Sequence, residues 1–498
     1  MEYQNYINGE WVPSHTGERY ESIDPATGEV IGTVPRSDEQ DVEAAVAAAR
    51  QAFEWWRLTP APRRGEILFE VGRLLRQHKQ ELGEFLTTEM GKVLPEALGD
   101  VQEAIDMAFY MGGEGRRLVG ATVPSELPNK FAMAVRDPVG VIGIITPWNF
   151  PIAIPSWKMF PALVAGNTIV FKPASDTPML AARFVEILEA AGVPPGVVNL
   201  VIGPGGTVGD AIVGHPGVNV VSFTGSTEVG RQVYVLGAQQ LKKVHLEMGG
   251  KNAIIVMDDA DLDLALDSVV WSAFGTTGQR CTAASRVIVQ SGIKREFTER
   301  LVDRVSKLRL GSGLLDTTDV GPVINRRALE KIHSYMDVAE VDGATVLTGG
   351  KIWSDGGKYA GGFFYEPTIF DNVTIDMRVA QEEIFGPCAS LITVDTLEEA
   401  IQANNRVAYG LSSSIFTRDV NVAFQAMRDF DTGLVYINHG TIGAEIHLPF
   451  GGNKGTGNGH REAGIAGIDV FTEWKSIYVD YSGRLQRAQI DTEGILGG

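Results

Sequence analysis

The amino-acid sequence predicts an α/β fold, because short apolar runs alternate with helical patterns over most of its length. From residue 139 onward, runs rich in β-branched residues are separated by amphipathic stretches such as 177–192. Apolar strands with helices between them are typical of a parallel sheet that helices cover on both faces. The first set of strands is predicted at 139–144, 167–172, 197–203, 218–225 and 242–248. A second set, which predicts another α/β domain, falls at 252–258, 286–290, 389–394, 412–417 and 433–438.

The N-terminal part of the chain predicts a strand followed by helices. Apolar residues at helical spacing follow Ser37, and Gln40 stands three positions after it, which is a capping-box pattern. A second long helical pattern covers 63–90. Extended structure is predicted for 119–136, and an edge strand is predicted around 475–481.

Composition narrows the functional classes. A chain of 498 residues with 44% hydrophobic residues is long enough for two or three domains with sizeable cores. Its net charge of −19 argues against a nucleic-acid partner or an anionic membrane surface, since neither attracts such a protein. Two cysteines cannot form a disulfide framework, so we expect a reducing compartment, the cytoplasm, and the first residues predict no signal peptide.

Two features imitate other classes of protein. The 20 residues between Asp137 and Lys158 are uncharged, the length of a transmembrane helix, but four prolines would break such a helix. We predict a buried strand, a turn and the start of a helix there. His439, Glu445 and His447 lie close in sequence but lack the HExxH spacing, so we expect no metal site.

Two glycine-containing loops follow predicted strands, and parallel sheets bind ligands beyond the carboxyl ends of their strands. At 203–209 a dinucleotide fingerprint has its third glycine one position late, so a flexible turn is as good an interpretation as phosphate contact. At 223–230 a strand leads through Gly225 and Ser226 into a helix. Free N–H groups at that helix start could hold a pyrophosphate, although an ordinary strand–helix turn remains the alternative.

Cys281 lies in the polar stretch GTTGQRCTAAS. A lone cysteine is most often a small buried apolar residue, and that interpretation stays open. As a nucleophile its thiol would need activation, to which Arg280 or a helix end could contribute. Glu247 and Asn149 end two predicted strands, so the carboxylate and an amide able to donate to an oxyanion are candidates for the same site. Surface loops are the alternative for both.

Six motifs occur in a fixed order along the chain: ITPWNFP, FKPAS, FTGSTEVG, LEMGGKN, GQRC and EEIFGP. In order and spacing they resemble the non-acylating members of the aldehyde dehydrogenase superfamily, over about Tyr6 to Asp480. GQRCTAASR and KPASDTP are most similar to the semialdehyde branch, which includes α-ketoglutaric semialdehyde dehydrogenases.

The resemblance implies NAD(P)-dependent oxidation of an aldehyde to a carboxylic acid. It implies that Cys281 attacks the aldehyde, that Asn149 and the Cys281 backbone N–H hold the oxyanion, and that Glu247 activates the water that hydrolyses the thioester. Together with the glycine loops, it implies cofactor contacts from Thr146, Pro147, Trp148, Lys172, Ser175, Gly205, Gly209, Gly225, Ser226, Glu383 and Phe385.

The family fold implies three parts. A Rossmann-like cofactor domain would comprise 1–118 and 139–247, and a catalytic domain would comprise 248–446. A bridging β segment of 119–138 and 474–498 would pair with a neighbouring subunit, giving a dimer or tetramer, while 447–473 would return to the body of the subunit. An edge strand that seeks a partner fits this expectation.

Cofactor and substrate preference depend on single residues. Many NAD-preferring relatives carry a glutamate three residues after the lysine that matches Lys172, whereas this chain has Ser175. Losing that acid removes repulsion toward a 2′-phosphate, so we expect NADP to be accepted, with NAD also possible. Arg280 could pair with the distal carboxylate of an acidic semialdehyde, or it could form a structural ion pair.

Four alternatives stay open in the sequence. The enzyme could instead have broad specificity for aliphatic and aromatic aldehydes. A cofactor-independent thiol hydrolase or amidase would also use a cysteine and a glutamate, but it would need neither FTGSTEVG nor EEIFGP. A structural role is disfavoured because Cys281, Glu247 and Asn149 are all present, and coenzyme A as acyl acceptor is disfavoured by Glu247.

Overall fold

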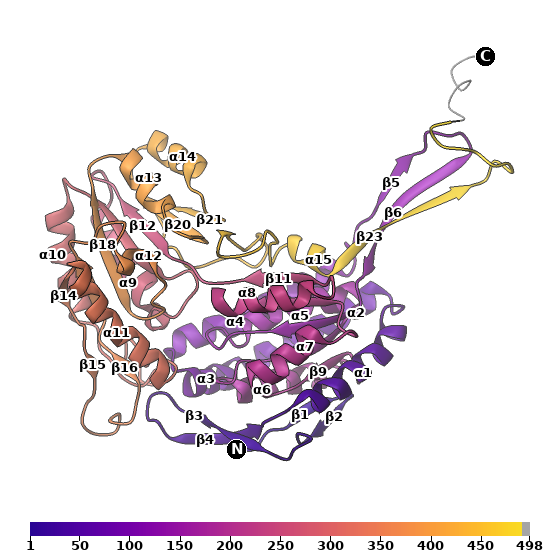
Figure 1. Ribbon diagram of the computed structural model, residues 1–498, viewed down its shortest axis with the longest axis horizontal. Helices are drawn as coiled ribbons and strands as arrows, with labels where there is room; N and C mark the ends of the chain where they lie inside the picture. The colour runs from indigo at the N-terminus through magenta and orange to yellow at the C-terminus, as the bar shows by residue number, and fades with distance from the viewer. Residues whose placement is uncertain (491–498) are drawn as a thin grey trace.

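The computed structural model describes residues 1–490 and contains two seven-stranded sheets and a three-stranded arm (Figure 1). The first sheet has the strand order β11-β10-β7-β8-β9-β1-β2. The second has the order β14-β17-β18-β13-β12-β20-β21. All ten strands predicted for the two sheets are present and run parallel to their neighbours in these sets, so the predicted α/β class is confirmed.

The first sheet has a doubly wound core. Its parallel strands are β7 (Val141–Ile145), β8 (Thr168–Lys172), β9 (Val198–Leu200), β10 (Val220–Thr224) and β11 (Lys243–Glu247), extended by the antiparallel β1 (Asn5–Ile7) and β2 (Glu10–Val12). After β7, the chain adds β8 and β9 on one side of it and then β10 and β11 on the other side. A ligand crevice is expected between the carboxyl ends of β7 and β10, where the winding direction reverses.

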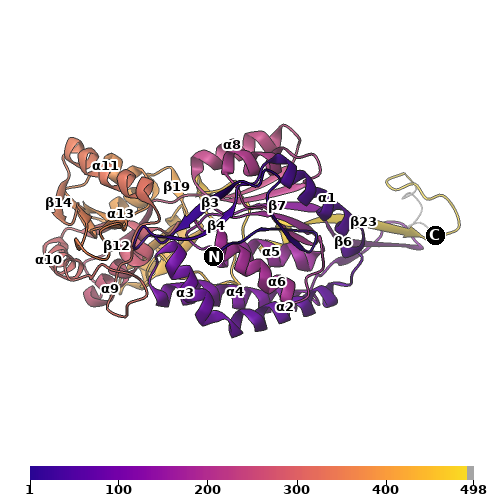
Figure 2. The same cartoon turned by 90° about the horizontal axis from the view of Figure 1, so that it is seen from below.

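Helices cover both faces of this sheet (Figure 2). One face carries α1 (Glu39–Trp56), α7 (Asp210–Gly214) and α8 (Thr227–Ala238), and the other carries α2 (Ala61–Gln77), α3 (Lys79–Met90), α4 (Leu94–Glu114), α5 (Ala153–Ala165) and α6 (Pro178–Ala190). Each face buries its own apolar cluster, which explains why the central strands are apolar throughout.

Two helix predictions need correction. The capping residue of α1 is Asp38 rather than Ser37, and it forms a capping box with Asp41, while the Ser37 hydroxyl accepts a hydrogen bond from Asn5. The pattern over 63–90 forms two helices, α2 and α3, which meet at His78 because its backbone leaves the helical conformation.

The second sheet repeats the same architecture. Its strands are β12 (Asn252–Val256), β13 (Ala284–Gln290), β17 (Thr368–Asp371), β18 (Cys388–Val394), β20 (Ser412–Phe416) and β21 (Leu434–Ile437), with the antiparallel β14 (Thr345–Thr348). Its helices are α9 (Leu262–Phe274), α10 (Lys294–Val305), α11 (Arg326–Asp342), α13 (Leu397–Asn405) and α14 (Val420–Asp429). Short elements are β3 (Arg19–Ile23), β4 (Val30–Pro35), β15 (Ile352–Trp353), β16 (Phe364–Tyr365), β19 (Tyr409–Gly410), β22 (Asn453–Lys454), α12 (Arg378–Gln381) and α15 (Ala466–Val470).

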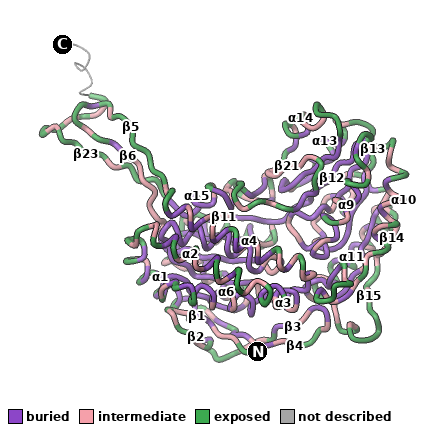
Figure 3. Tube along the Cα trace, turned by 180° about the vertical axis from the view of Figure 1, so that it is seen from behind, coloured by how far each residue is buried: buried purple, intermediate pink, exposed green. Residues whose placement is uncertain are grey.

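The arm consists of β5 (Ala121–Pro124), β6 (Lys130–Pro138) and β23 (Thr472–Asp480), and it projects away from the body (Figure 1). The strand expected around 475–481 is therefore confirmed as an edge strand of this sheet. Most arm residues are exposed or half-buried (Figure 3), and Trp474 and Tyr478 are 56% and 67% exposed. Residues 491–498 of the predicted bridging tail lie outside the described residues.

The uncharged run between Asp137 and Lys158 folds as expected, into the end of β6, β7, a turn and the first part of α5. Across residues 1–490, the helices are all too short or too polar to span a membrane.

Candidate active site

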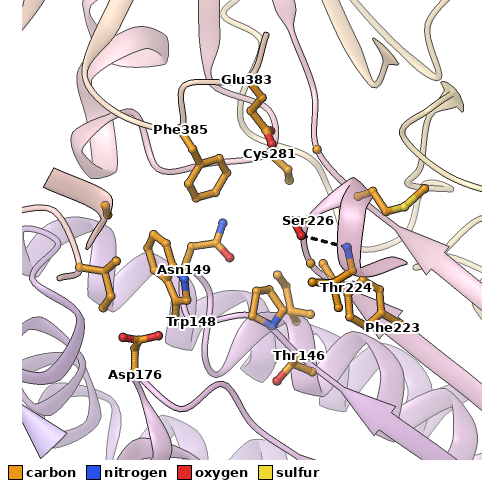
Figure 4. A pocket seen from close by; sticks show the side chains of 18 of the residues that line it. Thr146, Trp148, Asn149, Asp176, Phe223, Thr224, Ser226, Cys281, Glu383 and Phe385 are labelled. Carbon is orange, nitrogen blue, oxygen red and sulfur yellow. Dashed lines mark hydrogen bonds between the residues drawn. The ribbon is translucent and has the colours of Figure 1, made fainter. Parts of the chain in front are cut away.

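A cavity of about 600 Å³ opens at the carboxyl ends of β7 and β10, between loops of the two large sheets. Figure 4 shows Cys281, Asn149, Glu383 and Phe385 around the same space. Nine residues singled out from the sequence line it: Thr146, Pro147, Trp148, Asn149, Gly225, Ser226, Cys281, Glu383 and Phe385. The crevice therefore lies where the winding of the first sheet reverses.

The loop after β10 offers backbone donors to this cavity. Ser226 is the N-cap of α8, and its hydroxyl accepts a hydrogen bond from the Val229 N–H at 3.3 Å. The other N–H groups of the first helical turn have no partner within the helix, and with the helix dipole they favour an anion. A Cβ at Gly225 would lie 2.5 Å from the Phe223 ring, so only glycine fits this approach. These groups fit the pyrophosphate of a dinucleotide.

Four other predicted cofactor residues lie outside the lining of this cavity. Lys172 is buried at the end of β8, where its Nζ donates to the Pro173 carbonyl at 2.7 Å and burial lowers its pKa to about 8. Gly209 packs beside the Lys172 chain, and Gly205–Gly209 forms a turn of π-helix that continues into α7. Ser175 is exposed.

A strained turn precedes Cys281. Thr276, Thr277 and Gly278 have φ values of 50°, 57° and 67°, in the left-handed region that β-branched residues avoid. Glu96 holds the turn by accepting from both the backbone N–H and the hydroxyl of Thr276, at 2.8 and 3.0 Å. The Thr277 hydroxyl donates to the Gly321 carbonyl at 3.0 Å. Several hydrogen bonds thus fix the approach of the chain to the thiol.

A second, smaller cavity of about 60 Å³ meets the first at Cys281. Glu247, at the end of β11, and Arg280 line this smaller cavity. It also receives side chains from α4, α5 and the segment 443–462: Glu103, Ile154, Trp157, Phe450 and Glu462. Cys281 lines both cavities and so stands between the two spaces.

Asn149 is fixed from both sides. Its Nδ2 donates to the Gln279 carbonyl at 3.0 Å, which leaves the second amide hydrogen free, and its Oδ1 is buried without a partner among residues 1–490. Its backbone carbonyl accepts from the buried Lys92 Nζ at 2.6 Å. Lys92 also forms a buried ion pair, at 3.0 Å, with Asp100 on α4. This ion pair anchors the loop that carries Asn149.

Arg280 is engaged by its neighbours. Its Nη2 donates to Glu96 at 3.0 Å and its Nε donates to the Thr276 hydroxyl at 2.9 Å. This is the structural ion pair that the sequence left open, and it turns two nitrogens away from the thiol. Nη1 makes no hydrogen bond within the described part of the chain, and the side chain still lines the smaller cavity.

Burial controls the protonation of the two central groups. Burial and the nearby Glu247 and Glu383 raise the pKa of the Cys281 thiol to about 12, while the backbone N–H groups of Thr282 and Cys281 oppose the rise. Burial and then Glu462 raise the pKa of Glu247 well above its ordinary value. Arg280 therefore does not supply the activation that its position in the sequence suggested, and the resting thiol keeps its proton.

Several lining residues were not singled out from the sequence. In the large cavity these include Asp176, Asn325, Arg327 and Lys331, and in the small one Glu103, Phe150, Trp157 and Phe450. Asp176 directly follows Ser175 in KPASD, so its place in that strand-end loop was a usable signal. The positions of Glu103 on α4 and of Arg327 on α11 depend on tertiary packing, and no local pattern marks them. Among residues 1–490, the acidic, histidine and cysteine side chains form no cluster of three able to hold a metal ion.

Comparison with known proteins identifies the family. The sequence profile of the aldehyde dehydrogenase family matches residues 11–477. The chain belongs to the aldehyde dehydrogenase family. The enzyme is therefore an oxidoreductase acting on aldehydes in an NAD(P)-dependent family.

Similar sequences support the semialdehyde branch, and a solved structure supports the fold. The chain is 44% identical over 478 residues to an α-ketoglutaric semialdehyde dehydrogenase of Bacillus subtilis, covering 96% of this chain and 98% of that one. It is 45% identical over 480 residues to an α-ketoglutarate semialdehyde dehydrogenase of Haloferax volcanii, covering 96% and 99%. A crystal structure of Staphylococcus aureus betaine aldehyde dehydrogenase in complex with NAD⁺ superposes with a TM-score of 0.95 at 37% identity, covering 97% and 96%. The predicted resemblance to the semialdehyde branch is confirmed.

Proposed function

We propose that this enzyme oxidises an acidic semialdehyde to the dicarboxylic acid through a covalent adduct on Cys281, in a cytoplasmic, reducing environment that keeps both cysteines as free thiols. The observation that carries the proposal is the position of Cys281 at the junction of the two cavities. A nucleophile there reaches an aldehyde in the small cavity and faces a dinucleotide in the large one. When bound, that dinucleotide supplies the hydride acceptor.

The first half of the reaction needs a base and an oxyanion site. The thiol carries its proton at rest, and Glu247 lines the same small cavity with both carboxyl oxygens buried and without a hydrogen-bond partner among residues 1–490, so it takes this proton as sulfur attacks. The free amide hydrogen of Asn149 and the Cys281 backbone N–H hold the oxyanion of the thiohemiacetal. Re-formation of the carbonyl expels hydride and leaves a thioester. Covalent catalysis thus divides one difficult step into two easier ones.

The second half is hydrolysis of the thioester. Glu247 takes a proton from water, the resulting hydroxide adds to the carbonyl carbon, and the Cys281 sulfur leaves. Its raised pKa makes the Glu247 carboxylate a stronger proton acceptor than an ordinary glutamate. The carboxylic acid is released and the thiol regains a proton.

In this proposal the enzyme accepts both NAD and NADP, and NADP is accepted because protein side chains contact its 2′-phosphate. Ser175 is exposed and offers a hydroxyl, and Arg327 and Lys331 bring positive charge to the lining of the large cavity. Asp176 lines the same cavity and carries an opposing carboxyl group, whose pKa burial raises. The buried Lys172 and Gly209, with the exposed Gly205, form a platform around β8 and α7 for the adenosine end.

The acidic substrate is supported by the named relatives and by Arg280. Glu96 balances part of the Arg280 charge. We therefore propose that Arg280 Nη1 alone contacts the distal carboxylate of the substrate, rather than two guanidinium nitrogens binding both carboxylate oxygens. The small cavity is also lined by apolar and aromatic side chains, including Ile154, Trp157 and Phe450, and by the carboxyl groups of Glu103, Glu247 and Glu462.

The arm serves assembly in this proposal. Its exposed Trp474 and Tyr478 and its unpaired edges favour pairing with the edge strand of a neighbouring subunit, giving a dimer or tetramer. We propose the corresponding division into a cofactor domain (1–118 and 139–247), a catalytic domain (248–446) and a bridging segment (119–138 with the tail).

Aldehyde-dependent reduction of NAD and NADP, measured with a panel of acidic and neutral aldehydes, tests the proposal. We expect Cys281→Ala to lower kcat by at least about 10³-fold, because no other group can form the thioester. Dinucleotide binding, followed by protein fluorescence, should persist in the variant because most of the large cavity remains. Acid production from an aldehyde without a dinucleotide, or turnover of an aldehyde by Cys281→Ala, would contradict the proposal.

A further inference from the structure

His460 lies beside Glu247, and its Nε2 atom has no hydrogen-bond partner among residues 1–490. His460 Nε2 is 3.7 Å from Glu247 Oε1 and 3.9 Å from Glu462 Oε1. The His460 and Glu247 side chains are only 8% and 4% exposed. Both Glu247 oxygens and His460 Nε2 are fully enclosed, and none has a hydrogen-bond partner among residues 1–490. Buried polar atoms left unpaired at a reaction centre call for a functional explanation.

The neighbouring Asn458 fixes the tautomer of His460. The Asn458 Oδ1 accepts from the Leu246 N–H at 3.0 Å and its Nδ2 donates to the Val244 carbonyl at 2.5 Å, so the amide has one orientation. The same Oδ1 lies 3.1 Å from His460 Nδ1. Because that oxygen can only accept, Nδ1 carries the hydrogen in the neutral ring. Nε2 therefore presents its lone pair to Glu247.

A buried ion pair lies beside His460 and Glu247. Lys158, wholly buried on α5, forms an ion pair with Glu462 and donates to the Ser222 hydroxyl at 3.0 Å. Glu462 thus stays ionised, and its pKa is lowered to about 2, chiefly by Lys158 and His460 against the effect of burial. The charged or titratable groups that face His460 and Glu247 are Glu462 and Arg461 on the same segment, Lys158 on α5 and His245 on β11.

We propose that His460 acts as a positioning residue. It receives the proton from Glu247, and Glu247 thereby returns to its ionised form, the base, within each turnover. The assignment rests on the proposed function, because it presumes that Glu247 is the base. Imidazole is the side chain suited to exchanging protons near neutral pH. Glu462 stabilises the imidazolium, and a small rotation of Glu247 closes the remaining distance.

The proton count of the reaction explains the need for this group. Glu247 accepts one proton from the Cys281 thiol and a second from water, before the sulfur leaves as thiolate. The first proton must therefore move on before water is activated, and it passes from Glu247 to His460 Nε2. One proton then returns to the Cys281 sulfur, and the other leaves with solvent, which matches the single proton released when the product is counted as the undissociated carboxylic acid; ionisation of that acid releases a second.

His460→Gln tests the assignment, because glutamine keeps polar atoms there but cannot carry the proton. We expect the first turnover to yield about one reduced dinucleotide per subunit at the wild-type rate. The following steady state should be slower by about 10-fold or more, within the usual range for acid–base catalysis. The acid limb of the kcat–pH profile should move to higher pH by about one unit, because Glu247 must then lose its proton outright.

A cofactor-free measurement separates the hydrolytic half. With p-nitrophenyl acetate, the Cys281 sulfur takes the acetyl group and nitrophenolate leaves, after which water hydrolyses the thioester. His460→Gln should show a full nitrophenolate burst followed by slow release, whereas His245→Phe, which keeps the ring contact with His460, should behave as wild type.

The outcomes distinguish this assignment from the proposed function. An unchanged steady state and pH profile in His460→Gln, a loss of the burst as well, or the same shift in His245→Phe would overturn the role of His460. Glu247→Gln must itself lose both the burst and the hydrolysis, because Glu247 is the proposed base in both halves of the reaction. If Glu247→Gln or Cys281→Ala turns over normally, the proposed function fails first.

Discussion

The two cavities that meet at Cys281 are built in different ways. The large one is lined mainly by loops at strand ends and by the start of α8, so backbone groups and glycines shape it. The small one is lined by side chains from α4, α5 and the segment 443–462, which approach from separate parts of the chain. Its volume of about 60 Å³ is a tenth of the other, at about 600 Å³.

This difference separates what topology determines from what individual residues determine. A parallel sheet with this winding produces a ligand crevice at the reversal point whatever its helices carry. The small cavity has no such template, because replacing Glu103 or Phe450 would change its chemistry without changing the fold. The topology of the first sheet therefore determines where the large cavity lies, whereas individual side chains determine the chemistry of the small one.

Lys92 contacts one residue of each cavity, because its Nζ donates to the Asn149 carbonyl and lies 3.8 Å from the centre of the Phe150 ring, so its replacement should damage both cavities. Lys92→Met leaves Asp100 buried without its cation and frees the Asn149 carbonyl. We expect the free energy of unfolding to fall by about 3 kcal/mol, since an unpaired buried charge is costly. Urea denaturation measures this loss. Lys79→Met, which removes a less buried lysine bonded to Gln102, is the control and should cost under about 1 kcal/mol.

The same division explains how far the sequence could be interpreted. The strands, the loop at Gly225 and Ser226 and the strand ends at Asn149 and Glu247 follow local patterns, and the structure has them in one region. The left-handed backbone of Thr276 and Thr277 could not be predicted, since β-branched residues disfavour that conformation. Tertiary hydrogen bonds hold it, in which Glu96 accepts from Thr276 and the Gly321 carbonyl accepts from Thr277.

Side-chain partners far apart in sequence were also beyond prediction. Arg280 stands beside Cys281 in the sequence, which suggested activation of the thiol, but Glu96, 184 positions away, holds the guanidinium. Lys158 and Glu462 meet across 304 positions. Such pairs depend on packing that one sequence does not reveal, and they govern the electrostatics of the small cavity.

Arg280→Met tests whether the small cavity selects acidic substrates. Nη1 is the nitrogen left for a carboxylate, so we expect KM for an acidic semialdehyde to rise about 10-fold, equivalent to one charge-assisted hydrogen bond. KM for a neutral aldehyde of equal length should change less than about twofold. Glu96→Gln is the matched control, because it breaks the ion pair and keeps the Arg280 charge. Equal rises for both substrates would assign Arg280 a structural role alone.

Arg327→Ala addresses the large cavity only. Arg327 is exposed, lines the cavity and makes no ion pair in the described residues, so it is available to a 2′-phosphate. We expect kcat/KM for NADP to fall about fivefold, and kcat/KM for NAD and KM for aldehyde to stay within about twofold, since exposed charge pairs are weak. Arg326→Ala, at the adjacent position beside Phe363, should leave the cofactor ratio unchanged. A fall with NAD of the same size would remove Arg327 from cofactor selection.

The smallest effect is expected from pH acting on Glu103 in the small cavity. Burial, followed by Asp100, raises the pKa of Glu103 to about 8. The side chain is therefore neutral below that pH and tolerates a substrate carboxylate, whereas above it the new negative charge repels one. KM for an acidic semialdehyde should rise a few-fold between about pH 7 and 9, while KM for a neutral aldehyde should not follow it. Glu103→Gln should abolish that rise and leave the cofactor KM alone, because the residue lies outside the lining of the large cavity. A rise that persists in the glutamine variant would have to come from another group facing the thiol.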